Sequence, residues 1–405
     1  MQSPITTAVY CAPGNAATGS IAVNIDIAVT DVDRIVRFVN ERDVGLTIIG
    51  PEAAVAAALA DRLADAGRLA FGPTAGAGRI ESSKAFAKDV LTRSGVSTPA
   101  HRVFTDAGLA KDFVKGEGRP FVVKADGLAK GKGTVVPNDV EETIRAIDQL
   151  MVEKTVGVAG DSILLEEKIE GREVSLMAFV DGQRVIPLAP ACDYKRALAG
   201  DQGPNTGGMG GYSPVSFFTD ADVERAARTV FVPVVETLRA GGTSYRGCLY
   251  AGLMVGEGGL QVLEFNARFG DPEAEVVLPR LSDDLIPLME ATARGELRST
   301  SPAWSAKASV GVVLASEGYP GRYETGRAID GLSRLEPETY AFHAGTDAEP
   351  SGYVTAGGRV LTIVALGDTI AEARDRAYRN VDRIHFDGMT FRADVAQREI
   401  AVTTG

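Results

Sequence analysis

The chain is poor in the residues from which thiol, imidazole and metal-cluster sites are built. Its 405 residues include three cysteines, three histidines and one tryptophan. The cysteines lie far apart and follow neither a zinc spacing nor a disulfide framework. His101, His343 and His385 show no pattern of partners that would predict a Ser-His-Asp or Cys-His catalytic set, so we expect structural roles for them. The cytoplasm, a reducing compartment, is the expected location.

Long apolar runs and an excess of basic charge are also lacking. No apolar run approaches the roughly 20 residues that span a bilayer. The first residues, MQSPITTAVY, contain no basic region followed by an apolar core, so no secretory signal is expected. The formal net charge of −12 argues against a nucleic-acid-binding protein, which usually has a basic face. We therefore expect neither a nucleic-acid partner nor a membrane, although local lysines and arginines can still bind anionic substrates.

The composition that is present fits several globular domains, with 45% hydrophobic and 24% charged residues. We predict a multidomain fold of α/β and α+β type. Its parts are a parallel-sheet β/α domain at 1–82, a central α+β domain at 83–296 and a small C-terminal α+β domain at 297–405.

Strands and helices alternate in the first domain. Short strands are predicted at Thr7–Cys11, Leu46–Ile49 and Leu69–Phe71. Helices are predicted at Asp31–Asn40 and at Ala53–Ala66, where Gly67 ends the second one. This alternation is typical of a parallel sheet with ligands at the carboxyl ends of its strands.

Hairpin patterns replace this alternation in the middle of the chain. Strands at Ser162–Glu167 and Glu173–Val180 flank Glu170-Gly171-Arg172, which predicts a hairpin, and Pro120–Val180 is expected to form a small lobe. Strands at Tyr250–Val255 and Leu260–Asn266 predict a second hairpin. In the C-terminal part, Ser309–Leu314 and Arg359–Leu366 are predicted strands and Ile370–Ile384 a helix.

The strand that ends in Leu263-Glu264-Phe265-Asn266 has the pattern of a metal site. Side chains alternate along a strand, so Glu264 and Asn266 should share one face and Leu263 and Phe265 the other. A carboxylate and an amide oxygen at this spacing suit magnesium, which prefers oxygen ligands and often bridges phosphates. Taken alone, the pattern fits a solvated sheet face better than a metal site. Arg268 and Asp271 follow at once, however, in a loop stiffened by Gly270 and Pro272, and such an arginine can bind a carboxylate or a transferring phosphoryl group.

Three further segments carry candidate ligands. The glycine- and lysine-rich stretch Val123–Gly133 can bring backbone amides and positive charge to phosphates, although it lacks the Walker A spacing and also fits a flexible surface hairpin. The strand Leu164–Glu167 and the turn after it could present backbone groups to an adenine and a carboxylate to a ribose, or form an ordinary charged hairpin. The loop Gly203–Tyr212 follows Asp193-Tyr194-Lys195-Arg196. It has few side chains that could pack in a core and many accessible backbone groups, which favours ligand binding.

In this order and spacing, the segments resemble the phosphoribosylamine–glycine ligase (glycinamide ribonucleotide synthetase) family of the ATP-grasp superfamily. The resemblance runs along essentially the whole chain, through the motifs APGN, GPEA, VVKADGLAKGKG, GPNTGGMG, LEFNARFGDPE, FHAGT and GGRVL. GPNTGGMG together with RFGDPE is more specific than any glycine loop. The resemblance implies a pre-ATP-grasp domain at 1–82, an ATP-grasp domain at 83–296 and a C-terminal domain. It also implies ligation of glycine to 5-phosphoribosylamine in de novo purine synthesis, with ATP cleaved to ADP and phosphate.

The resemblance also implies roles for individual residues. ATP phosphates would be bound or covered by Lys84, Lys124, Gly131, Lys132 and Gly133. Adenine and ribose would be bound by Glu166, Glu167, Lys168, Ile169 and Glu173. Mg²⁺ or Mn²⁺ would be held by Glu264 and Asn266. Catalytic roles fall to Arg268 and Asp271. Glycine and phosphoribosylamine would be lined by Gly14, Asn15, Glu52, Asp193, Lys195, Asn205, Thr206, Gly207, Gly208, Met209 and Pro272.

The implied mechanism uses no covalent enzyme intermediate. The glycine carboxylate attacks the γ-phosphate to give glycyl phosphate, and the amine of phosphoribosylamine then displaces phosphate. Positioning and charge neutralisation would supply the catalysis. The enzyme is expected to be a monomer or a small homo-oligomer.

The family pattern begins with a strand and a GxGGREHA turn that this sequence does not contain. We expect that the recorded start lies too far downstream and that upstream DNA encodes this segment in frame. A chain without it would have exposed edges at Thr7–Cys11 and Leu46–Ile49, low stability and weak phosphoribosylamine binding.

Three alternative functions remain. Another ATP-grasp carboxylate–amine ligase would share the ATP site, but should lack GPNTGGMG and RFGDPE together. A nucleotide-binding regulator would bind ATP without glycine-dependent release of ADP. A truncated paralogue would have impaired activity or none.

Overall fold

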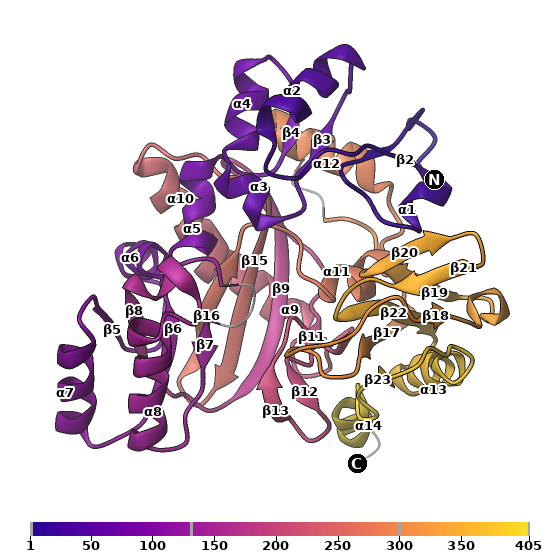
Figure 1. Cartoon of the computed structure of the whole chain (residues 1–405). Coiled ribbons are helices and arrows are strands. Elements are labelled where there is room, and N and C mark those ends of the chain that lie inside the picture. The colour runs from indigo at the N-terminus through magenta and orange to yellow at the C-terminus, as the bar shows by residue number, and fades with distance from the viewer. Residues whose placement is uncertain (1–2, 130–132, 299–300, 404–405) are drawn as a thin grey trace.

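The β/α pattern of the first residues produces an N-terminal domain with very short strands. In the computed structural model, which describes residues 3–129, 133–298 and 301–403, this domain lies at the top of Figure 1. Its elements are β1 (Tyr10–Cys11), α1 (Thr18–Ile21), β2 (Val23–Asn24), α2 (Val32–Glu41), β3 (Thr47–Ile48), α3 (Glu52–Ala56), α4 (Leu59–Asp65) and β4 (Ala70–Phe71). The parallel pairs β1–β2 and β3–β4 form two separate two-stranded sheets instead of one. Val23 and Ile48 are exposed on them.

The single helix predicted over Ala53–Ala66 is wrong, because the chain forms α3 and α4 there. Ala58 between them has a φ of +61°, a left-handed conformation that ends the first helix. The bend turns Leu59 and Leu63 of α4 into the core that Ile35 and Val39 of α2 also enter. Burial of these leucines offsets the cost of the left-handed alanine.

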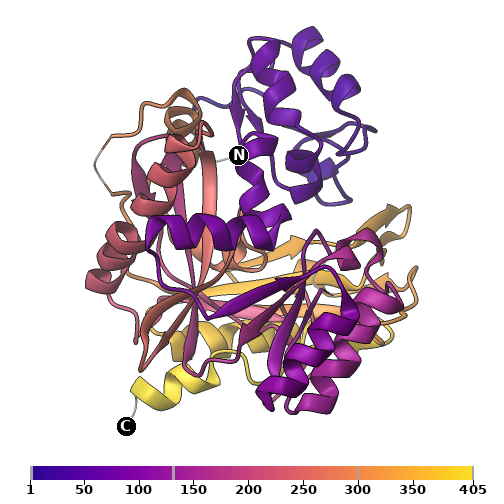
Figure 2. The same ribbon diagram turned by 90° about the vertical axis from the view of Figure 1, so that its left-hand side faces the viewer.

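The central domain has two lobes, each built on a four-stranded sheet. The small lobe has the strand order β5-β8-β6-β7, and α7 and α8 pack on it (Figure 2, lower right). Its elements are β5 (His101–Phe104), α7 (Ala107–Glu117), β6 (Phe121–Ala125), β7 (Thr134–Val135), α8 (Val140–Ile147) and β8 (Ile163–Glu167). The large lobe has the order β10-β9-β15-β16. Its strands are β9 (Arg172–Asp181), β10 (Val185–Pro187), β15 (Arg246–Gly256) and β16 (Gly259–Asn266).

Helices complete the large lobe around this sheet. They are α5 (Ala75–Ser82), α6 (Lys84–Ser94), α9 (Asp220–Ala226), α10 (Val232–Ala240), α11 (Glu273–Val277) and α12 (Leu285–Arg294). Of the two predicted hairpins, β15–β16 is present as an antiparallel pair. The hairpin predicted around Glu170-Gly171-Arg172 is wrong, because β8 and β9 belong to different sheets. The small lobe therefore begins with β5 at His101 and ends at Glu167, so the predicted range Pro120–Val180 is wrong at both ends. Residues 168–171 cross from one sheet to the other.

The C-terminal domain is built on a sheet that begins in the central part of the chain. Its strand order is β11-β14-β17-β22-β19, and β23 also pairs with β17. These strands are β11 (Cys192–Asp193), β14 (Gly210–Ser213), β17 (Ala308–Ser316), β19 (Thr339–His343), β22 (Arg359–Gly367) and β23 (Met389–Thr390). Because β11 and β14 precede residue 297, the sheet crosses the predicted domain boundary. One large core cluster consequently joins the central and C-terminal domains.

The remaining C-terminal elements lie around this sheet. They are β18 (Ala328–Ile329), β20 (Thr346–Glu349), β21 (Gly352–Thr355), α13 (Ile370–Val381) and α14 (Gln397–Thr403). A short hairpin of β12 (Arg196–Leu198) and β13 (Gln202–Asn205) projects near α14 (Figure 1). In the part of the chain that the structure describes, no helix combines the length and the apolar character needed to cross a membrane.

Candidate active site

A cavity of about 1350 Å³ lies where the domains meet, and most of the predicted site residues line it. The N-terminal domain contributes Glu52, both lobes of the central domain contribute residues, and Tyr319 and Arg359 come from the C-terminal domain. The predicted residues in the lining are Glu52, Lys84, Lys124, Gly133, Glu166, Glu167, Lys168, Ile169, Glu173, Asp193, Lys195, Asn205, Thr206, Gly207, Glu264, Asn266, Arg268 and Asp271.

The end of β16 carries Glu264 and Asn266 into this cavity. Leu263 and Phe265, which the predicted alternation assigns to the other face, line it as well. A bulge interrupts the alternation at Leu263: Gly252 pairs with Glu264 and Leu253 pairs with Val262, which leaves Leu263 as the extra residue. Burial alone would raise the pKa of Glu264, but Lys195, Lys124, Lys84 and Arg268 outweigh it and lower that pKa. Glu264 is therefore a carboxylate in a strongly cationic setting.

Two lysines share one buried carboxylate beneath the cavity. Glu166 in β8 is 2% exposed and accepts ion pairs from Lys88 at 2.9 Å and Lys124 at 2.7 Å. Although burial raises the pKa of Glu166, the two lysines lower it overall. Lys124 also donates to the carbonyl of Leu263 at 2.9 Å, which fixes its ammonium group at the junction of both lobes. Lys88, which lies one helical turn after Lys84 in α6, belongs to none of the predicted motifs.

Lys195 lies near the end of β16, beside Glu264. Its ammonium group lies 2.8 Å from Glu173, the predicted ribose ligand, and 3.9 Å from Glu264. Burial and the nearby carboxylates of Glu273, Glu173 and Glu264 raise the pKa of Asp193 to about 8, although Lys195 opposes them. Asp193 can therefore exchange a proton near neutral pH.

Arg268 and Asp271, the predicted catalytic pair, are each held by residues from another element. Arg268 lies 3.2 Å from Glu81 and 3.6 Å from Glu52, so it connects the N-terminal domain to β16. Asp271 receives two hydrogen bonds of 2.8 Å from the guanidinium of Arg359, one to each carboxylate oxygen. Such bidentate pairing fixes the carboxylate in direction as well as in place.

Arg359 also joins the two loops that carry the most specific motifs. It donates to the carbonyl of Gly207 at 2.7 Å, and the hydroxyl of Tyr319 accepts from the Gly207 amide at 3.1 Å. Gly208 has a φ of +107°, and a Cβ there would lie 2.4 Å from Cδ of Pro272. Only glycine allows this approach, so GPNTGGMG and RFGDPE form a single packed unit.

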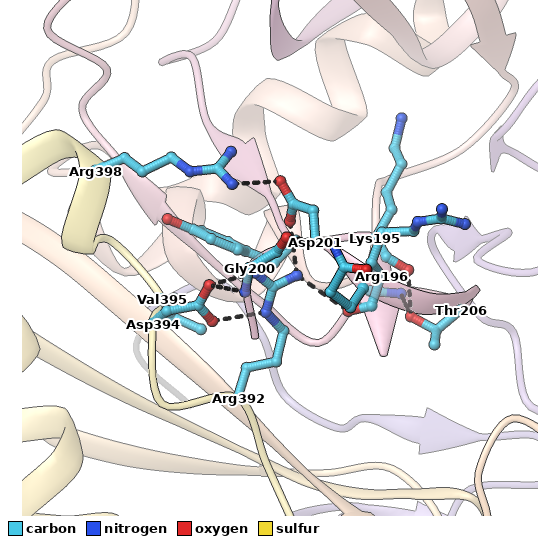
Figure 3. A network of polar contacts seen from close by, with 12 residues as sticks. Lys195, Arg196, Gly200, Asp201, Thr206, Arg392, Asp394, Val395 and Arg398 are labelled. Carbon is cyan, nitrogen blue, oxygen red and sulfur yellow. Dashed lines mark hydrogen bonds and ion pairs between the residues drawn. The ribbon is translucent and has the colours of Figure 1, made fainter. Parts of the chain in front are cut away.

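A second guanidinium supports the same region from below, as Figure 3 shows. Arg392 is buried and contacts Asp394, Asp201 and the carbonyl of Arg196. Its guanidinium lies 4.6 Å from the centre of the Tyr194 ring. The segment after β23 thus lies against the β12–β13 hairpin, which leads into Asn205, Thr206 and Gly207.

Several predicted residues lie outside the lining. Asn15 instead donates to the carbonyl of His343 at 2.7 Å, so the Gly14-Asn15 turn lies against the C-terminal domain. Gly208 and Pro272 pack on each other, and Met209 is buried with Val313 and Ala315. The remaining two, Gly131 and Lys132, lie outside the described residues. His101, His343 and His385 are absent from the lining, and His101 and His343 contact nearby backbone or hydroxyl oxygens.

Glu264 and Asn266 fit a divalent cation that ATP helps to bind. No group of three or more His, Cys, Asp or Glu side chains that could hold a metal was found within residues 3–129, 133–298 and 301–403. A carboxylate and an amide oxygen on one strand suit a hard cation whose remaining ligands are phosphate oxygens and water. Lys84 and Lys124 beside them supply charge to the same phosphates.

Comparison with known proteins agrees with this arrangement of domains. Models of the N domain, the ATP-grasp (A) domain and the C domain of phosphoribosylglycinamide synthetase match residues 1–81, 82–274 and 309–398. A phosphoribosylamine–glycine ligase of Halalkalibacterium halodurans is 45% identical over 400 residues, which cover 99% of this chain and 93% of that protein. The chain belongs to the phosphoribosylglycinamide synthetase family.

Other members of the family support the assignment, and a more distant structure shares only the fold. The phosphoribosylamine–glycine ligase of Escherichia coli O157:H7 is 43% identical over 404 residues, which cover 98% of this chain and 94% of that protein. The crystal structure of the Thermotoga maritima phosphoribosylamine–glycine ligase has a TM-score of 0.84 at 32% identity and covers 96% of this chain and 94% of that one. A biotin carboxylase from Campylobacter jejuni shares the fold at 16% identity, with a TM-score of 0.73 over 94% of this chain and 86% of that one.

Proposed function

We propose that this member of the phosphoribosylglycinamide synthetase family joins glycine to 5-phosphoribosylamine in purine synthesis, with ATP cleaved to ADP and phosphate. The observation that carries the proposal is the packing of the Asn205–Met209 loop on the Arg268–Glu273 loop, directly beside Glu264 and Asn266. The two loops supply oriented amides, a guanidinium and a carboxylate close to the proposed position of the terminal phosphate of ATP.

ATP is proposed to lie between the two sheets of the central domain. Lys84 and Lys124 would contact the phosphates, and the backbone of Glu167, Lys168 and Ile169 would line the adenine. Glu173 would accept hydrogen bonds from ribose hydroxyls, which requires Lys195 to exchange its present partner. Glu166 is buried between Lys88 and Lys124, so its side chain would balance their charge more than it would contact the base.

Mg²⁺ or Mn²⁺ would be held by Glu264 and Asn266 and would neutralise charge on the phosphates when bound. Arg268 would orient the glycine carboxylate towards the γ-phosphate. Glu52 and Glu81 limit the motion of its guanidinium. Asp271, fixed by Arg359, would bind the ammonium group of glycine.

The second step requires an amine to lose a proton as it attacks glycyl phosphate. Asp193 lines the cavity, and its raised pKa suits a group that would accept this proton. Closure of the lobes over the bound substrates would exclude water from the acyl phosphate. A monomer or small homo-oligomer in the cytoplasm stays the expected form.

The proposed reaction is tested by measuring the release of ADP and phosphate with each component omitted in turn. The proposal predicts release that requires ATP, a divalent cation, glycine and phosphoribosylamine, and a product that contains glycine. Release that does not depend on glycine would refute it. If another carboxylic acid were a better substrate than glycine, the protein would be a different ATP-grasp ligase.

A further inference from the structure

The β12–β13 hairpin lies between the small lobe and the C-terminal end of the chain. At its base, the side-chain amide of Asn205 donates to the carbonyl of Thr134 in β7 at 3.2 Å. Thr134 belongs to the four-stranded sheet of the small lobe and lines the cavity. The hairpin is therefore one point at which the small lobe contacts the rest of the protein.

The turn of this hairpin is held by charged groups from the C-terminal segment. Asp201 accepts from Arg392 at 2.9 Å, and its other oxygen lies 2.6 Å from Arg398. The amide of Gly200 donates to Asp394 at 2.9 Å (Figure 3). Asp201 has a φ of +55°, a conformation that is uncommon for a residue with a side chain, so the turn depends on such contacts.

Arg392 is the centre of this arrangement. It is 1% exposed, and its guanidinium makes a bidentate pair with Asp394 at 2.8 and 2.6 Å. The remaining nitrogen donates to Asp201 and, at 3.1 Å, to the carbonyl of Arg196. A single buried side chain thus contacts both the first strand of the hairpin and its turn. A lysine could not replace this planar set of donors.

We propose that Arg392 is a positioning residue that acts through the hairpin on how the small lobe closes over the cavity. From the C-terminal segment it holds β12 and the Asp201 turn, so that β13 presents Asn205 to Thr134 and Thr206-Gly207 to the cavity. Arg392 itself lies behind the lining and touches no substrate. Loosening of the hairpin would remove this contact between the small lobe and the rest of the protein.

The expected effect of a loosened hairpin on the reaction rests on the proposed ligase function. An acyl phosphate in a poorly closed site is open to water, whose oxygen adds to the acyl carbon. The bond from that carbon to the phosphate oxygen then breaks, and glycine, inorganic phosphate and a proton are released. ATP is consumed in this side reaction without ligation, so the ratio of ADP formed to glycine ligated rises above one.

The test is that ratio, measured in the full chain with the variants Asp201→Gly and Arg392→Gln. Glycine suits the left-handed backbone at position 201, so Asp201→Gly removes the side-chain contacts without adding strain. We expect the ratio to rise about twofold or more in both variants. Asp201→Asn, which keeps one neutral hydrogen bond, should restore the ratio in part. If Arg392→Gln does not fold, Asp201→Gly decides the question alone.

Arg280→Gln is the matched control, because Arg280 is also buried and bonds to Lys307 and Ser213 but does not contact the hairpin. It should lower the melting temperature and leave the ratio at one, since the ratio does not depend on how much enzyme is folded. An unchanged ratio in Asp201→Gly, or an equal rise in Arg280→Gln, would overturn the proposal. Failure of the ligase function itself would be separate, because the unaltered chain would then show no glycine-dependent ADP at all.

Discussion

At the scale of single residues, Glu264 combines a position on the cavity wall with a lowered pKa. The cations Lys195, Lys124, Lys84 and Arg268 keep it ionised despite its surroundings. Of the two proposed metal ligands, Glu264 is the charged one. Its substitution should therefore affect turnover strongly and the stability of the fold little.

Glu264→Ala is expected to lower kcat by about 10²–10³-fold or more, since a preorganised electrostatic contact would be lost. The melting temperature should change little, because among the described residues the Glu264 side chain has no hydrogen bond and lies 3.9 Å from the ammonium group of Lys195. Steady-state kinetics and thermal unfolding measure the two effects. Glu257→Ala, in the exposed turn of the same hairpin, is the control and should retain activity. Near-normal turnover by Glu264→Ala would remove this residue from the proposed metal site.

A second residue, Glu275, makes stability depend on pH. Burial, followed by the charge of Asp271, raises its pKa to about 8, and within the described residues its Oε2 atom has no hydrogen-bond partner. An unfolded glutamate has a pKa of about 4.3. Between these values the folded state retains a proton that the unfolded state has lost. Stability should therefore fall as pH rises from about 4 to about 8.

Glu275→Gln should remove this part of the pH dependence, because glutamine mimics the protonated form. Its stability relative to the unaltered chain should increase from about pH 5 to about pH 8, by no more than about 1.4 kcal/mol per pH unit. Urea unfolding across this range measures it. Glu224→Gln on the exposed face of α9 should leave the slope unchanged. Parallel curves for Glu275→Gln and the unaltered chain would show that Glu275 is ionised in the fold.

At the scale of elements, the close contact of two loops depends on Gly208. A Cβ there would meet Pro272 at 2.4 Å, and the φ of +107° is strained for any side chain. Gly208→Ala should therefore separate the Asn205–Met209 loop from the Arg268–Glu273 loop and lower kcat/KM for glycine by about 10²-fold. Gly242→Ala shares the positive φ but has open space around it, so it should lose some stability and retain kcat/KM. Equal kinetic effects of the two variants would mean that contact between the loops is unimportant.

Elements defined by local patterns were predictable from the sequence. The helix α2 and the hairpin β15–β16 lie where periodicity and turn residues place them. The pairing of β8 and β9 in different sheets was not predictable, because the partners of a strand can lie far away along the chain. The break at Ala58 and the bulge at Leu263 also depend on packing against distant residues.

The same distinction applies to the candidate site. Motif residues such as Glu264 and Arg268 could be named from their order in the chain. Arg359 and Arg392 could not, since each is 88 or more residues from the acidic partner it holds across domains. Lys88 was missed because a lysine on a helix is usually solvated, whereas here it is buried against Glu166.

At the scale of the whole molecule, the cavity is complete only when three domains are assembled. Arg359 of the C-terminal domain is the direct link to Asp271, so Arg359→Leu tests whether this domain contributes to glycine binding or only to folding. We expect kcat/KM for glycine to fall by about 10–100-fold, because Asp271 would lose its bidentate partner.

Binding of a non-hydrolysable ATP analogue should be retained in Arg359→Leu, because the hydrogen bonds of this side chain go to Asp271 and Gly207. At 100 times the dissociation constant, the analogue should stabilise both proteins by about 2.7 kcal/mol. Thermal unfolding with and without the analogue measures this effect. Loss of the stabilisation in the variant would mean that the C-terminal domain also shapes the ATP site.

The central claim is that the glycine carboxylate attacks the γ-phosphate in this cavity. It is tested most directly with glycine labelled by ¹⁸O in its carboxylate, supplied with ATP, a divalent cation and phosphoribosylamine. If glycyl phosphate forms and the amine displaces phosphate, one labelled oxygen leaves with each phosphate, and mass spectrometry of the inorganic phosphate will detect it. Unlabelled phosphate, formed together with the ligated product, would contradict the account.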